Sequence, residues 1–110
     1  MRSHLAPIAL IILGLTALGL GGPLAAAPDA DRIVIDQFMF QPTTLTIKAG
    51  STVTWQNEDE EPHTVVSASG LFRSAALDTH EQFSFTFSKP GTYPFVCSIH
   101  PQMIGTIVVQ

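Results

Sequence analysis

The regular alternation of apolar and polar residues most limits how this chain can fold. Four segments carry an apolar side chain at every second position: residues 44–48, 52–56, 82–88 and 93–97. A period of two places the apolar side chains on one face, which is typical of half-buried strands. Glycine and proline turns punctuate these segments at short intervals, as at 49–51 and 89–91. Many short strands separated by turns predict an all-β sandwich or small barrel.

Shorter apolar patterns extend this interpretation to both ends of the same region. Ile33–Ile35 forms a short run, and Ile107 and Val109 share one face of a final strand. The residues from Ser74 to His80 are the best candidate for a short helix. No internal repeat or low-complexity linker is present, so we expect a single domain.

The N-terminal residues have the composition of an export signal. Arg2 precedes an uncharged apolar stretch from Leu5 to Leu20, and small residues follow at 25–27. This order is typical of a cleaved secretory signal. We therefore predict a signal peptide at 1–27 and one domain at 28–110. The alternative is an uncleaved anchor, although the stretch is shorter than the roughly 20 residues that a spanning helix prefers.

The single cysteine, Cys97, rules out an internal disulfide. In an oxidising compartment a free thiol is a liability unless it is buried, paired with another chain or bound to a metal. The formal net charge of −4 disfavours nucleic-acid binding, which needs a basic face. An exported chain with one cysteine is thus a candidate for a metal protein.

Three possible metal ligands lie three residues apart on one loop. Cys97 ends a predicted strand, and His100 and Met103 follow it before the last strand. Pro101 restricts the loop backbone and favours a tight return. One short loop cannot surround a metal, so a fourth ligand must come from elsewhere.

His63 is the best candidate for that fourth ligand. His4 belongs to the predicted signal, and His80 lies in a polar stretch. His63 instead follows the Trp55 strand after a short loop and precedes another strand-like segment. This order places it at the end of a sheet.

Two imidazoles, one thiolate and one thioether are the ligands of a blue-copper site, with methionine as the weak axial ligand. Zinc gains little from methionine, and structural zinc sites usually use more cysteines. We therefore predict one copper ion per chain that cycles between Cu(I) and Cu(II) and carries single electrons. The alternatives are a copper-trafficking or buffering protein and, as a third class, an enzyme such as a nitrite reductase or oxidase.

The chain resembles the cupredoxins of the plastocyanin and azurin superfamily, and most closely the amicyanin branch. The resemblance covers nearly the whole of residues 28–110. It rests on the segments 48–55, 57, 62–63, 84–87 and 91–93 and on the ligand loop 97–103. It implies an all-β Greek-key sandwich with copper at one end.

The same resemblance implies roles for two further residues. Asn57 matches the asparagine that forms hydrogen bonds across the ligand loops in this family, and such bonds orient ligands. Pro62 would direct its carbonyl at the copper from the side opposite Met103. The position after the first histidine is Thr64, where many relatives have asparagine.

A docking surface is also expected around an exposed edge of His100. We predict that Ile99, Pro101 and Phe38 contribute to it, and that the acidic run 58–61 is either a solvated loop or a steering patch for a basic partner. The predicted partners are an electron donor and an acceptor, both redox proteins. The mature protein is predicted to be a periplasmic monomer with no membrane attachment.

Overall fold

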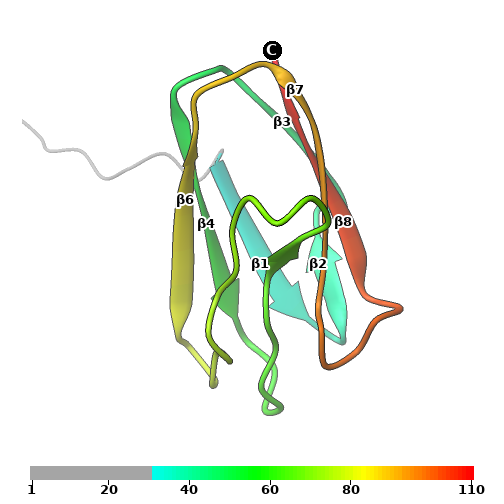
Figure 1. Ribbon diagram of the computed structural model, residues 1–110. Coiled ribbons are helices and arrows are strands. Elements are labelled where there is room, and N and C mark those ends of the chain that lie inside the picture. The colour runs from blue at the N-terminus through cyan, green and yellow to red at the C-terminus, as the bar shows by residue number, and fades with distance from the viewer. Residues whose placement is uncertain (1–30) are drawn as a thin grey trace, which may run out of the picture.

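A computed structural model describes residues 31–110, which form eight strands in two facing four-stranded sheets (Figure 1). The predicted all-β sandwich is confirmed. The predicted signal peptide at 1–27 and the first residues of the 28–110 domain lie outside the described residues. Within the described part of the chain, no helix is long and apolar enough to cross a membrane.

The strands have a Greek-key order, and from the second strand to the seventh the chain changes sheet at every step. The first sheet has the order β2 (Met39–Gln41), β1 (Arg32–Asp36), β4 (Ser51–Asn57) and β6 (Gln82–Phe87), and the second has the order β3 (Thr44–Ile47), β8 (Ile104–Val109), β7 (Gly91–Val96) and β5 (Val66–Ser67). The pairs β1–β4 and β3–β8 are parallel, and the other pairs are antiparallel. Because sequence neighbours are often not sheet neighbours, the chain crosses repeatedly between the sheets.

Aromatic side chains fill the space between the two sheets. Trp55 of β4 is fully buried and meets Phe95 of β7 edge to face, with ring centroids 5.4 Å apart. Phe40 of β2 contacts the same Phe95 ring at 4.7 Å. These residues come from the apolar face of each strand, so the alternation in the sequence defines the core.

Two local features differ from the sequence-based expectation. The short helix predicted from Ser74 to His80 is wrong, because no residue of this segment is helical, Leu77 forms an isolated bridge with His63, and the segment ends in a turn. This tertiary pairing outweighs the local helical tendency. Strand β2 was not predicted, because it is three residues long and only Phe40 in it is buried, which is too short for a periodic pattern.

Residue 105 of β8 must be glycine, because the ring of Phe95 lies directly over it. It is the register partner of Phe95, and a Cβ atom built at Gly105 would clash with Cζ of that buried ring. We expect Gly105→Ala to lower the free energy of unfolding by about 1–3 kcal/mol, as overpacking does. Urea unfolding followed by the fluorescence of Trp55 measures this, since Trp55 is the only tryptophan in the chain.

The double variant Gly105→Ala with Phe95→Leu is the control for that prediction. If the clash with the ring is the cause, the cost of the alanine shrinks in the leucine background. An equal cost in both backgrounds would place the cause elsewhere.

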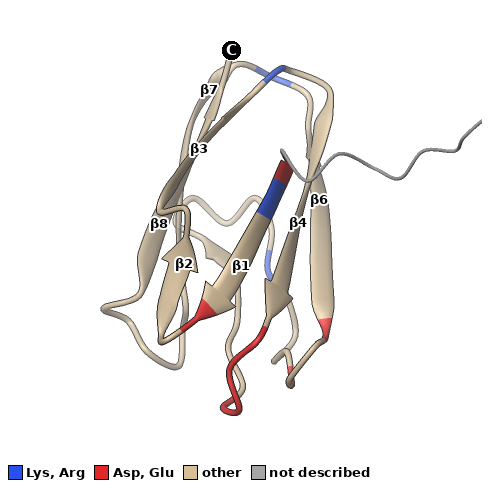
Figure 2. Ribbon diagram, turned by 180° about the vertical axis from the view of Figure 1, so that it is seen from behind, with Lys and Arg blue, Asp and Glu red and all other residues tan. Residues whose placement is uncertain are grey.

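Three connections meet at the end of the sandwich opposite the C-terminus (Figure 1). They are the β1–β2 turn, the β4–β5 connection and the β7–β8 loop. Figure 2 shows acidic residues gathered at this end, whereas Lys48 and Lys89 lie in turns at the other end. The same end holds the candidate metal ligands.

Candidate metal centre

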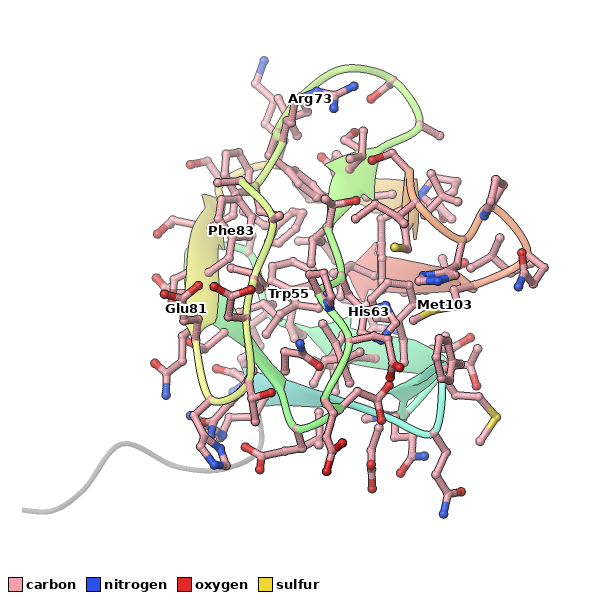
Figure 3. All side chains as sticks on the ribbon, turned by 90° about the horizontal axis from the view of Figure 1, so that it is seen from below. Trp55, His63, Arg73, Glu81, Phe83 and Met103 are labelled. Atoms are coloured by element: carbon pink, nitrogen blue, oxygen red, sulfur yellow. The ribbon has the colours of Figure 1, made fainter. Side chains whose placement is uncertain are left out.

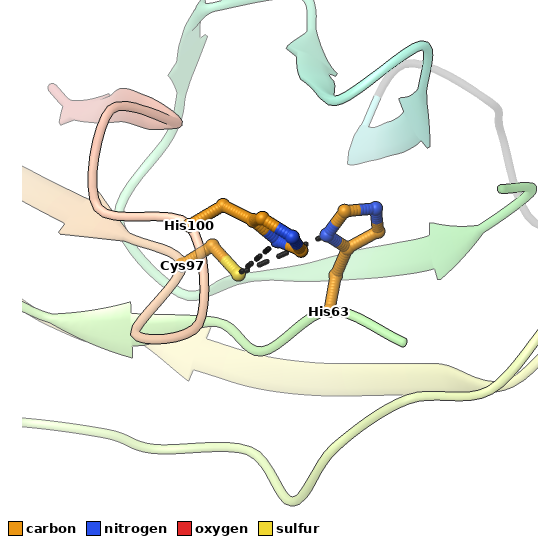
Figure 4. Close-up of side chains that lie close together, drawn as sticks. All are labelled: His63, Cys97 and His100. Carbon is orange, nitrogen blue, oxygen red and sulfur yellow. Dashed lines mark hydrogen bonds between the residues drawn. The ribbon is translucent and has the colours of Figure 1, made fainter. Parts of the chain in front are cut away.

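His63, Cys97 and His100 come together at this end of the sandwich (Figure 4). The Cys97 Sγ atom lies 3.8 Å from Nδ1 of His63 and 3.8 Å from Nδ1 of His100, and the three donor atoms lie within 4.8 Å of one another. His63 and Cys97 are fully buried, while His100 is partly exposed. His80 is 71% exposed and its Nδ1 lies 3.1 Å from a carboxylate oxygen of Glu58, outside this cluster.

The two sulfur–nitrogen separations fit a metal bound by these side chains. A metal bonded to sulfur at about 2.3 Å and to nitrogen at about 2.0 Å separates these two donors by about 3.7 Å when the angle at the metal is about 120°. Both observed sulfur–nitrogen separations are close to this value. One thiolate and two imidazoles in a plane are the strong ligands of blue copper, so the residues present fit copper.

The β7–β8 loop is folded by its own backbone hydrogen bonds. The N–H of Cys97 donates to the carbonyl of Met103 at 3.1 Å, and the N–H of Met103 donates to the carbonyl of His100 at 2.8 Å. These bonds bring the backbone of Met103 close to that of Cys97 and His100. Met103 is 3% exposed, and Figure 3, which views the molecule from below, shows its side chain next to that of His63 in projection.

The backbone of His63 is held by two hydrogen bonds with Leu77. The N–H of His63 donates to the carbonyl of Leu77 at 3.1 Å, and the N–H of Leu77 donates back at 2.7 Å. The imidazole Nε2 lies 2.8 Å from Oδ2 of Asp59. The ring is therefore fixed both at its backbone and at the nitrogen that faces away from Cys97.

Asp59 sets the tautomer of His63. Burial favours a raised pKa for Asp59, but hydrogen bonds from the backbone N–H groups of Phe38 and Gln37, together with His63, outweigh it and hold the pKa below its ordinary value. An ionised carboxylate only accepts hydrogen bonds, so Nε2 of His63 carries the hydrogen. In the neutral imidazole the lone pair is then on Nδ1, and this nitrogen faces the sulfur of Cys97.

Asp59 differs from the expectation that the acidic run 58–61 is either a solvated loop or a steering patch. Glu60 and Glu61 are exposed, whereas Asp59 is 9% exposed and points at His63. Sequence reasoning missed this role of Asp59. The available signal was a carboxylate four residues before a candidate ligand, inside the same loop.

Thr64 links the two loops that carry the ligands. Its N–H donates to the Cys97 sulfur at 3.4 Å, and its hydroxyl oxygen lies 3.8 Å from the same sulfur. That oxygen also accepts a hydrogen bond from the N–H of Ser98 at 2.8 Å. These contacts hold the sulfur of Cys97 in place relative to the segment that carries His63. In the sequence, Thr64 is notable only because many relatives have asparagine at this position.

Asn57 is fully buried and organises the loop of His63. Its side-chain amide donates to the carbonyls of Glu61 and Leu77, each at 2.9 Å, and its Oδ1 accepts from the N–H of Asp59 at 2.9 Å. None of these three bonds reaches the β7–β8 loop that carries Cys97. The hydrogen bonds across to the Cys97 loop come from Thr64, because that residue directly follows His63 and reaches the sulfur. Pro62 is exposed.

Of the three predicted docking residues, Ile99 and Pro101 flank His100 in the sequence, and Phe38 contacts its ring. Phe38 lies in the β1–β2 turn, and its ring meets His63 at 5.1 Å and His100 at 5.0 Å, edge to face in both pairs. Phe38 is 41% exposed and Ile99 is 47% exposed, and Pro101 is exposed as well. Apolar surface therefore surrounds the exposed ligand.

Comparisons with known proteins agree with this geometry. The family model for a cupredoxin-like domain matches residues 7–109. The chain is 38% identical to amicyanin of Paracoccus denitrificans, over 80% of this chain and 73% of that protein. It is 34% identical to amicyanin-alpha of Methylorubrum extorquens, over the full length of both.

Solved structures show the same architecture. The copper(I) form of an amicyanin variant superposes with a TM-score of 0.71 at 31% identity, covering 77% of this chain and 86% of that one. A copper-containing nitrite reductase from Thermus scotoductus has a TM-score of 0.72 at 32% identity. That match covers 83% of this chain but only 24% of the reductase.

Proposed function

The chain belongs to the cupredoxin-like domain family, and from this premise we propose that it is a type 1 blue-copper protein that carries single electrons between redox partners. The observation that carries the proposal is the cluster of His63, Cys97 and His100: their donor atoms lie within 4.8 Å of one another, and Cys97 Sγ lies 3.8 Å from Nδ1 of each histidine. These three donors match blue copper in type and spacing. We propose that Met103 would also hold the copper, because it closes the same loop and is buried.

Copper, when bound, supplies a one-electron couple between Cu(I) and Cu(II). The residues of the chain hold the ligands in place for both states. His63 is anchored by Leu77 and Asp59, and the sulfur of Cys97 is held by Thr64. Because these ligands are buried and already oriented, a change of charge requires little movement, which favours fast electron transfer.

His100 is the proposed exit for the electron. It is partly exposed, in contrast to the buried His63, and the apolar residues Phe38, Ile99 and Pro101 lie beside it. A small apolar contact suits a brief encounter with a partner. The exposed carboxylates Glu60 and Glu61 lie in the β4–β5 connection at the same end, where they favour a basic partner.

An introduced charge at Ile99 tests this surface. Electron exchange between two copies requires two His100 edges to approach, so we expect Ile99→Glu to slow self-exchange at low salt by roughly tenfold or more, because like charges then meet. NMR line broadening in mixtures of oxidised and reduced protein measures the rate.

Leu71→Glu provides the matched control. Leu71 is 49% exposed, nearly the same as Ile99, but it lies outside both ligand loops. An equal loss of rate in both variants would contradict a docking surface at His100.

The main test of the function is a redox titration of the copper-loaded protein. We expect an intense blue colour in the oxidised form and a reversible one-electron midpoint. A colourless Cu(II) adduct, or a couple that does not reverse, would exclude the electron-carrier role.

Two other functions have less support. A copper-trafficking or buffering protein needs an exchangeable metal, whereas His63 and Cys97 are fully buried. Slow loss of copper to a chelator over many redox cycles is expected for a carrier and would exclude trafficking. For an enzyme, a second centre is expected. Among residues 31–110, His63, Cys97 and His100 form the one group of three or more His, Cys, Asp or Glu side chains spaced to bind a metal.

We also propose export to the periplasm with the N-terminal residues removed as a signal peptide. The support is the order of basic, apolar and small residues at 2–27. Mass spectrometry of the protein recovered from the periplasm tests this, and an intact N-terminus would contradict it.

A further inference from the structure

The Asp59 carboxylate joins parts of the metal centre that are separate in the sequence. Its Oδ2 accepts hydrogen bonds from Nε2–H of His63 at 2.8 Å and from the N–H of Phe38 at 2.9 Å. Its Oδ1 accepts from the N–H of Gln37 at 2.7 Å. One carboxylate thus connects the β1–β2 turn to the first imidazole.

The backbone of Asp59 is fixed as well. Its N–H donates to Oδ1 of Asn57 at 2.9 Å, and its carbonyl accepts from the hydroxyl of Thr79 at 2.7 Å. A side chain held at both its backbone and its carboxylate has little freedom. Asp59 therefore presents its charge to His63 in one defined position.

The turn that Asp59 holds is strained. Gln37 and Phe38 have φ values of 56° and 58°, in the left-handed region that residues with a side chain adopt at a cost. Hydrogen bonds from both N–H groups to Asp59 stabilise this conformation. The turn then places the Phe38 ring edge-on against His63 and His100.

The charge of Asp59 is directed at the metal centre. Its side chain is 9% exposed, and among residues 31–110 its only salt-bridge partner is His63. A hydrogen bond to a carboxylate makes the imidazole a stronger donor at its other nitrogen. Imidazole suits Cu(II), whereas thiolate and thioether favour Cu(I), so a stronger imidazole donor favours the oxidised state.

We propose that Asp59 is a positioning residue of the metal centre, which holds His63 as an Nδ1 ligand and by its negative charge stabilises Cu(II) over Cu(I). The proposal rests on the copper function proposed above. Its consequence is a midpoint potential lower than that of the same site without the charge.

The test compares Asp59→Asn with the unchanged protein. The asparagine oxygen can still accept hydrogen bonds from Nε2–H of His63 and the N–H of Phe38, but the charge is lost and the NH2 group cannot accept from the N–H of Gln37. We expect the affinity for Cu(II) to fall 10- to 100-fold, the range for partners of metal-ligating histidines. The affinity for Cu(I) should fall less. Each tenfold difference between the two raises the one-electron midpoint by about 59 mV.

Glu60→Gln is the matched control. It removes an exposed negative charge from the same loop without changing the group bonded to His63. We expect a potential shift below one third of that in Asp59→Asn. An unchanged potential in Asp59→Asn, or an equal shift in Glu60→Gln, would overturn the proposal.

A second measurement needs no metal. In the copper-free full chain, we expect ¹⁵N NMR to show His63 with its hydrogen on Nε2 and slow exchange of that hydrogen with water. In Asp59→Ala we expect fast exchange, and in Asp59→Asn an intermediate rate. Equal exchange in all three proteins would overturn the positioning role. If the unchanged protein shows no blue band, the proposed function fails instead, so the two failures are distinguishable.

Discussion

Replacing Cys97 with serine is expected to abolish the intense visible absorption of the oxidised copper protein. The absorption of a blue-copper site arises from charge transfer between the thiolate and Cu(II). Cys97 is the only cysteine in the chain, so no other residue can supply the sulfur. Serine is a harder ligand and stays protonated, so affinity for Cu(I) falls as well. Absorption spectroscopy of Cu(II)-loaded Cys97→Ser and unchanged protein measures the loss.

His80→Gln is the control for this substitution. It removes a histidine that is 71% exposed and outside the cluster. Its visible band should match that of the unchanged protein. A blue band that survives Cys97→Ser would mean that the chromophore is not the proposed site.

Copper loading is expected to raise stability strongly. A ligand that binds the folded state alone adds about 2.7 kcal/mol at 100 times its Kd and about 4.1 kcal/mol at 1,000 times its Kd. For a domain of this size, 1 kcal/mol shifts Tm by about 4–8 °C. We therefore expect an increase of more than about 10 °C in thermal unfolding of the loaded protein compared with the copper-free protein.

Ligand variants separate the metal contribution from the packing contribution. His100 is partly exposed, so His100→Ala should leave the copper-free Tm nearly unchanged and remove most of the copper-dependent increase. His63 is fully buried and bonded to Asp59. His63→Ala should therefore also lower the copper-free stability by about 1–3 kcal/mol, because it leaves a buried carboxylate with one partner fewer. A full copper-dependent increase in either variant would remove that residue from the ligand set.

The strands could be predicted from the sequence because their signal is local. In β4 and β6, alternate residues such as Val53 and Trp55, or Phe85 and Phe87, turn toward the core. The short strand β2 and the extended segment around Leu77 could not be predicted in this way. Each depends on a partner that is distant in the sequence, Phe40 on the core and Leu77 on His63.

The sequence by itself determined most of the ligand loop. Cys97, His100 and Met103 are neighbours on one tight turn, so their spacing alone brings them near one point. His63 required the fold, because it lies 34 residues before Cys97 and meets it only when the two loops pack at the same end.

The tertiary structure alone decided how the ligands are held. Asp59 and Thr64 have ordinary loop positions in the sequence, and the spacing of four residues between Asp59 and His63 does not by itself show that this carboxylate turns inward. The β1–β2 turn supplies two N–H donors that draw the Asp59 carboxylate inward to His63, and Thr64 faces the sulfur of Cys97. Hydrogen bonds between segments far apart in the sequence fix the positions of Asp59 and Thr64. These positions are therefore defined only in the folded sandwich.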